Sequence, residues 1–172
     1  GFTATIPEGW VLASKEDIAL YSGMAVDLIE TVTDFDPNAA VTLMICSELP
    51  FGSATDFNPN INIAYAAQQD MRLFTDAALF NKLLDDLQEI YTNAFEPIYP
   101  NPSVSVGGEQ SFKLNGREYV LINTTTEFDG GTMYQEQYST KVGDGMLTFV
   151  AAYYDTADKA MTDVFIQSLM FE

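Results

Sequence analysis

The feature that most constrains the fold is a run of four strand-like segments in the C-terminal half, separated by glycine-containing turns. Asn115-Gly116 lies between the first two segments, and this dipeptide is a strong signal for a two-residue β-hairpin. Two more glycine turns follow, in "EFDGGTMY" and "KVGDGMLTF". Segments joined by such short turns pair with their neighbours, so we predict an antiparallel meander. The predicted strands cover residues 103–114, 117–128, 132–142 and 146–154.

The composition of these strands also predicts what covers them. Apolar residues in "EYVLI" and "MLTFVAAYY" occupy both parities, whereas a strand with one face in water would alternate. We therefore expect material on both faces of the sheet. A short strand that ends before Pro7, and two strands at Ala40–Ser47 and Ile61–Gln68, complete it.

Three helices are predicted between and after the strands. The first covers residues 15–32 and begins at a capping box formed by Ser14 and Asp17. The second begins near Asp76 and ends before Pro97. Its apolar stripe consists of Phe80, Leu83, Leu84, Leu87, Ile90, Tyr91 and Ala94. The third covers residues 156–169, with a predicted buried face made of Ala157, Met161, Val164, Phe165 and Ser168.

The order of these elements predicts one α+β domain over residues 1–172. We expect a largely antiparallel sheet of about six to seven strands, with the three helices packed on its faces.

Charge narrows the range of partners. Asp and Glu number 25 against 7 Lys and Arg, which gives a net charge of −18. The bases are scattered along the chain, so no basic patch is available to neutralise nucleic-acid phosphates. Anionic membrane surfaces repel such a chain for the same reason. Cations, basic proteins and neutral small molecules remain as partners.

Residue content excludes several kinds of catalysis. The chain has no histidine, which removes histidine-based triads and zinc sites. Its one cysteine, Cys46, lies in the apolar run "VTLMICSEL", so we expect a buried small side chain and not a nucleophile. No nucleotide-binding glycine motif is present. Paired carboxylates remain open in principle, but nothing singles out a pair, and we predict that the chain is not an enzyme.

One candidate ligand site lies in "MYQEQY". Tyr134, Glu136 and Tyr138 share one face of a predicted strand. Two tyrosines beside a carboxylate can line a polar pocket for a small ligand or a cationic peptide side chain. The alternative is that the tyrosines pack under a helix with their hydroxyls in water. Trp10 has the same two interpretations, as a plug at one end of the core or as an exposed ligand platform.

A second candidate site comes from two similar hexapeptides, "TDFDPN" at residues 33–38 and "TDFNPN" at residues 55–60. Both place carboxylate or amide oxygens at alternate positions, as calcium loops do. The candidate metal ligands are Asp34, Asp36, Asn38, Asp56, Asn58 and Asn60. We expect no cofactor, and calcium is the one that this pattern would suggest.

The hexapeptides nevertheless depart from a calcium loop. Such a loop needs glycine after the third ligand and an acid at position twelve. The first copy has Ala39 and Ile45 there, and the second has Ile61 and Ala67. The alternative is a turn, in which Asp and Asn side chains bond nearby backbone groups. If the strands that follow the two copies pair antiparallel, the copies lie roughly 25 Å apart and cannot share one ion.

Several short motifs together resemble the PsbP-like fold family. They are "F-x-x-x-I-P-E-G-W" at Phe2–Trp10, "NINI" at Asn60–Ile63, "LNGREY" at Leu114–Tyr119 and "SLMF" at Ser168–Phe171. The chain is most similar to the secreted or lipid-anchored bacterial members, whose functions are mostly unassigned. The resemblance implies a three-layer α/β/α sandwich and an extracytoplasmic location. The long first helix departs from the PsbP pattern, so a metal role is not carried over.

These observations predict a non-enzymatic binding or interaction domain at the cell envelope. Its partner is expected to be a protein or a small molecule, and its membrane contact an N-terminal lipid anchor encoded upstream of Gly1. The chain begins with Gly1 and not Met, which agrees with a processed N-terminus. A small-molecule or divalent-cation binding protein that uses an acidic, tyrosine-lined surface is the alternative. A carboxylate-based hydrolase is a third interpretation.

Overall fold

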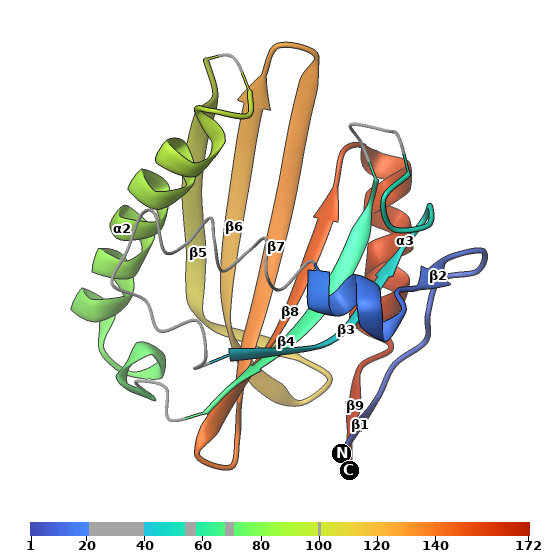
Figure 1. Cartoon of the computed structure of the whole chain (residues 1–172). Helices are drawn as coiled ribbons and strands as arrows, with labels where there is room; N and C mark the ends of the chain where they lie inside the picture. The colour runs from blue at the N-terminus through green and yellow to red at the C-terminus, as the bar shows by residue number, and fades with distance from the viewer. Residues whose placement is uncertain (21–39, 54–57, 68–70, 100) are drawn as a thin grey trace.

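A seven-stranded antiparallel sheet forms the centre of the computed structural model (Figure 1). The structure describes residues 1–20, 40–53, 58–67, 71–99 and 101–172. The strand order is β2-β3-β4-β8-β7-β6-β5, and a separate two-stranded sheet pairs β1 with β9. The bounds are β1 Phe2–Thr3, β2 Val11–Leu12, β3 Ala40–Ser47, β4 Asn60–Ala66, β5 Ser103–Leu114, β6 Arg117–Phe128, β7 Gly131–Val142, β8 Gly145–Tyr153 and β9 Met170–Phe171.

The predicted meander is confirmed as β5 to β8, with every boundary within one residue of its predicted position. The first hairpin turns at Asn115 and Gly116, which both have positive φ angles, of 50° and 77°. Two-residue hairpin turns of this kind need positive φ at both positions, and asparagine and glycine tolerate it best. Local turn chemistry therefore determines the register of the longest strands.

The strands β3 and β4 form an antiparallel pair, as the sequence predicts. Ala40 is opposite Ala66, and Ser47 is opposite Asn60. The two strands therefore begin at opposite ends of the pair. The chain then passes through the 3-10 helix η2 (Met71–Phe74) and α2 (Ala77–Phe95) to reach β5 at the far edge of the sheet.

The helices α2 and α3 (Thr156–Gln167) pack on opposite faces of the sheet, which confirms the α/β/α layering (Figure 1). On the α2 side, Phe80 packs with Val120 and Ile122. On the α3 side, the larger core cluster includes Tyr119 and Leu121. Four consecutive residues of β6 are thus buried on alternating faces, as the "EYVLI" run predicts.

Local signals also define the helix starts. The Ser14–Asp17 capping box is present, since the Asp17 backbone N–H donates to Ser14 Oγ and the Ser14 N–H to Asp17 Oδ2, both at 3.1 Å. Residues 15–20 are helical, and the rest of the predicted first helix lies outside the described residues. Asp76 caps α2 by accepting bonds from the N–H groups of the first turn.

None of the described helices combines the length and the apolar composition that crossing a membrane requires.

The predicted buried face of the last helix is wrong by about one residue. Val164 is 44% exposed, whereas Thr162, Phe165 and Ile166 are buried. The helix turns so that Ile166, together with Leu169 just beyond its end, enters the core, which buries more apolar surface than Ala157 and Val164 would. Ser168 instead accepts a hydrogen bond from the Thr5 backbone N–H at 2.7 Å and so ties the N-terminal segment to α3.

Candidate functional site

The carboxylate of Glu136 on β7 is the centre of a polar network beside α3. Tyr138 Oη donates to Glu136 Oε2 at 2.6 Å, and Tyr153 Oη donates to Glu136 Oε1 at 3.0 Å. Lys159 Nζ lies 3.2 Å from Glu136 Oε1 and 2.9 Å from Asp163 Oδ1. One carboxylate therefore joins β7, β8 and α3.

Tyr134, Glu136 and Tyr138, which the sequence singles out, lie close together, but the two tyrosines make different contacts. Tyr138 contacts Glu136 directly. Tyr134 instead stacks on Tyr153, with ring centroids 5.4 Å apart and an interplanar angle of 16°. Tyr153 and Lys159 were not predicted, because they come from β8 and α3. The only signal in the sequence is the register that places Tyr153 opposite Tyr134, and it requires knowing that β7 pairs with β8.

Burial and charge fix the protonation states in this network. Burial raises the pKa values of the Tyr138 and Tyr153 hydroxyls, and the Glu136 carboxylate raises them further. Burial alone would lower the pKa of Lys159, but its contacts with Asp163 and Glu136 outweigh this effect, so the pKa is raised. At neutral pH the tyrosines are therefore neutral donors and Lys159 is a cation.

Beyond Glu136, several of the described residues on the same side of the sheet are exposed or half-buried. Along β6, Asn123 and Glu127 are exposed and Thr125 is half-buried, while Thr124 and Thr126 between them are buried. We call this solvent-facing side of β5–β7 the open face. It comprises Ser103, Ser105, Gly107 and Glu109 of β5, Asn123, Thr125 and Glu127 of β6, and Thr132 and Tyr134 of β7, with Glu136 at its border.

The strand register places these side chains in rows across the sheet. Ser105, Thr125 and Tyr134 form one row, and Gly107, Asn123 and Glu136 form the next. The α3 helix packs at the β8 end of this surface, while α2 lies beside β5 and covers the other face (Figure 1). The open face is thus a mainly polar surface that contains one aromatic ring, and the Glu136 network lies at its border.

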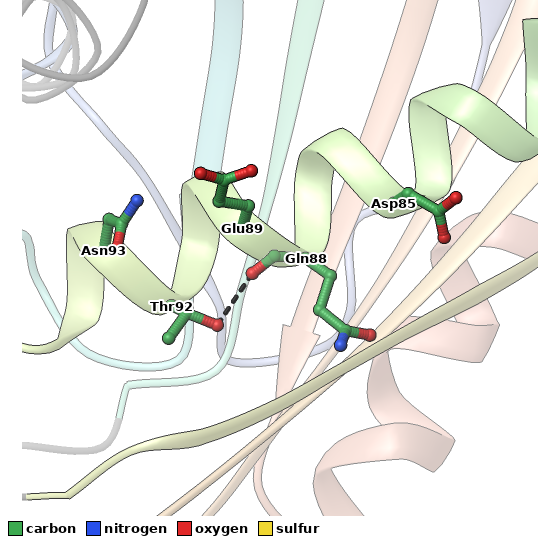
Figure 2. Close-up of a pocket in the computed structure, with 5 residues that line it drawn as sticks. All are labelled: Asp85, Gln88, Glu89, Thr92 and Asn93. Carbon is green, nitrogen blue, oxygen red and sulfur yellow. Dashed lines mark hydrogen bonds between the residues drawn. The ribbon is translucent and has the colours of Figure 1, made fainter.

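A separate hollow of about 340 Å³ runs along α2 and is lined by Asp85, Gln88, Glu89, Thr92 and Asn93. Figure 2 shows that all five side chains come from this one helix, and that the Thr92 hydroxyl is directed at the Gln88 carbonyl, to which it donates at 2.7 Å. Gln88 Oε1 accepts from the Val106 N–H of the edge strand β5 at 3.4 Å. This arrangement is that of a solvated helix face that protects a sheet edge.

The hexapeptide residues Asn58 and Asn60, which the structure describes, form hydrogen bonds with backbone groups of the β3–β4 connection. Asn58 Oδ1 accepts from the Leu49 N–H at 2.9 Å, and Asn58 Nδ2 donates to the Leu49 carbonyl at 3.1 Å. Asn60 Nδ2 donates to the Asn58 carbonyl at 3.0 Å. The remaining candidate ligands, Asp34, Asp36, Asn38 and Asp56, lie outside the described residues. Within the described ranges, no group of three acids or cysteines is placed to hold a metal ion.

Two other residues take the structural role that the sequence favours. Cys46 has no exposed surface, and burial raises the pKa of its thiol to about 11. Trp10 is half-buried and packs against the α3-side core.

Comparison with known proteins supports the fold. No family model matches the sequence, and no curated protein matches it. The solution structure of cyanobacterial PsbP (CyanoP) from Synechocystis sp. PCC 6803 is similar, with a TM-score of 0.60 at 11% identity, over 100% of this chain and 87% of that one. LpqN, involved in cell envelope biogenesis of Mycobacterium tuberculosis, has a TM-score of 0.49 at 12% identity, over 98% and 82% of the two chains. The similarity to PsbP confirms the PsbP-like fold expected from the sequence.

Proposed function

We propose that this chain is a non-enzymatic binding domain of the cell envelope that takes a positively charged protein segment on its open face. The observation that supports this most is the alternation of exposure along β6, where Asn123 and Glu127 are exposed and Thr125 is half-buried, while Thr124 and Thr126 are buried. Among the described residues, this face thus carries exposed and half-buried polar side chains on β5 to β7, whereas α3 packs on it at the β8 end.

The charge of the open face favours a cationic partner. Glu109 and Glu127 lie on it, and Glu136 lies at its border. The only base of the border network, Lys159, is already paired with Glu136 and Asp163. The net charge of −18 adds long-range attraction for a basic partner.

The shape of the open face favours an extended segment over a small molecule. Three strands give a width of roughly 10 Å, and the span from Ser103 to Glu109 along β5 gives a length of roughly 20 Å. The Tyr134 ring, held by its stack on Tyr153, offers a place for a guanidinium to lie flat. Exposed hydroxyl and amide groups around it supply hydrogen bonds.

The residue content supports a non-catalytic role. The chain has no histidine, and its only cysteine is buried with a raised pKa. The extracytoplasmic location is the expectation from the family resemblance in the sequence, and protease accessibility of the native protein on intact cells would test it.

A direct test uses capped penta-arginine and pentalysine peptides at physiological salt. In an NMR titration of the labelled protein, we expect saturable shifts at Gly107, Asn123 and Thr125, with penta-arginine binding more tightly. Tyr134→Ala should remove the preference for arginine, because the stacking surface is lost while every charge is kept.

The matched control separates a site from general acidity. The double variant Glu109→Gln/Glu127→Gln removes two charges from the open face, and Asp85→Asn/Glu89→Gln removes two from the exposed side of α2. We expect the first to weaken peptide binding about tenfold and the second by less than about twofold. Equal losses in both variants, or shifts spread evenly over the acidic surface, would contradict the proposal.

A further inference from the structure

Two of the seven bases lie together at the opposite end of the sheet from the open face. Arg117 begins β6 and Lys141 is near the end of β7, and both line a hollow of about 260 Å³ where η2 leads into α2. The remaining lining residues are Phe74, Thr75, Glu118 and Thr140. The bases look scattered in the sequence, and only the β6–β7 register brings these two together.

Arg117 is held in a fixed position. Its Nε donates to Thr140 Oγ1 at 2.8 Å, and its Nη2 donates to the Lys141 carbonyl. Its guanidinium carbon lies 3.9 Å from the centroid of the Phe171 ring. Thr140 Oγ1 in turn donates to the Glu118 carbonyl at 2.9 Å. A guanidinium fixed on one side in this way presents its remaining N–H groups without further loss of side-chain freedom.

Lys141 and Arg117 also lack a charge partner within the described residues. The Lys141 Nζ lies 4.9 Å from the centroid of the Phe74 ring. Lys82 and Lys159, by contrast, each form an ion pair with a carboxylate. The carboxylate in the lining, Glu118, accepts a hydrogen bond from Ser111 Oγ at 2.5 Å on the neighbouring strand. Two unpaired cations in one hollow are unexpected in a chain where acids outnumber bases 25 to 7.

We propose that this hollow binds a phosphate group. The fixed Arg117 guanidinium, the Lys141 ammonium and the Thr75 side chain line a space large enough for one such group. Phosphate takes charge-assisted bonds from both kinds of base. The group can belong to a small phosphorylated molecule or to a lipid headgroup. The hollow lies roughly 25 Å along β6 from Thr125, so this inference is independent of the open face.

Inorganic phosphate is the probe, titrated into labelled protein at neutral pH with total ionic strength held constant. We expect the backbone amide signals of Thr75, Arg117 and Lys141 to shift with one common dissociation constant. Lys141→Gln should raise that constant at least about fivefold, because it removes one charge-assisted contact.

Lys82→Gln is the matched control, since it removes the same charge from the exposed side of α2. It should change the dissociation constant by less than about twofold. Arg117→Lys keeps the charge but loses the fork geometry, and it should also weaken binding. The absence of a saturable shift, or equal effects of Lys82→Gln and Lys141→Gln, would overturn the proposal.

A second measurement distinguishes the two sources of phosphate. Co-sedimentation with vesicles of phosphatidic acid in phosphatidylcholine, lost in Lys141→Gln but kept in Lys82→Gln, supports a lipid headgroup. Phosphate binding in solution without co-sedimentation supports a small phosphorylated molecule. Failure of the arginine peptides on the open face would leave both results unaffected.

Discussion

At the residue scale, Glu136 determines how β7, β8 and α3 meet. Its two carboxylate oxygens accept from two tyrosine hydroxyls and contact the Lys159 ammonium. A carboxylate with three donors is satisfied where it is partly buried, and removing it would leave those donors without their partner. The same bonds hold Tyr153 under Tyr134, so the aromatic part of the open face depends on this network.

The tyrosines of this network predict a loss of stability in alkali. The pKa values of Tyr138 and Tyr153 are raised by burial and by Glu136, so the folded state retains protons that the unfolded state loses above pH of about 10. Their contribution is complete below that pH and declines above it. The Lys159 contribution also declines as pH rises through its raised pKa.

Denaturant unfolding between about pH 8 and about pH 11 measures this effect. We expect the free energy of unfolding to fall above pH of about 10, and to fall less steeply in Tyr138→Phe/Tyr153→Phe. A free energy that stays level, or an unchanged slope in the double variant, would show that these hydroxyls titrate normally.

At the element scale, the adjacent glycines Gly107 and Gly108 of β5 have different surroundings on the two faces of the sheet. A Cβ added at Gly108 would lie 2.3 Å from the Leu121 carbonyl oxygen and 3.1 Å from Phe80 Cζ of α2. A Cβ at Gly107, on the open face, would meet nothing within 4 Å. Gly108 therefore allows β5 to approach both the β6 backbone and α2 closely, and Gly107 has no such role.

Alanine substitutions at these two positions form a matched pair. Gly108→Ala should destabilise the fold by about 2 kcal/mol or more, since backbone must shift to admit the methyl group. Gly107→Ala should change the free energy of unfolding by less than about 0.5 kcal/mol. Urea unfolding of both variants measures the difference, and equal losses would mean that the open face is covered.

The accuracy of prediction from sequence also differs between elements. The meander boundaries depend on residues such as Asn115 and Gly116, whose backbone preferences act locally, and these boundaries are correct to within one residue. The buried face of α3 depends on which apolar residues the distant strands leave room for, and here the sequence is wrong about Val164. Period-two alternation is enough to place Tyr134, Glu136 and Tyr138 on one face of a strand. The position of Lys159 beside Glu136 depends on how α3 packs on the sheet, which the sequence pattern does not indicate.

At the scale of the whole molecule, the net charge of −18 is the dominant property. Self-repulsion of this size destabilises the compact state, and salt screens it. We expect the melting temperature to rise with sodium chloride concentration. The same screening explains why a rise with calcium alone would not identify a calcium site.

The proposal that the hexapeptides bind calcium is tested against this background. Micromolar calcium in physiological salt should raise the melting temperature only if a specific site exists. Asp56→Asn, with Asp85→Asn as the control of equal charge, then shows whether the second hexapeptide is responsible. If every salt of equal ionic strength gives the same shift, the hexapeptides act as turns and not as calcium sites.

The two chain ends lie side by side, where Phe2 pairs with Phe171 and the Glu172 N–H donates to the Gly1 carbonyl at 3.2 Å (Figure 1). The order of elements is therefore nearly circular. A short linker between the ends, with new ends opened at the exposed Asp129-Gly130 turn, would give a circular permutant with the same sheet. Such a chain would begin with β7, β8 and α3, so the residues of the Glu136 network would be synthesised first and as neighbours.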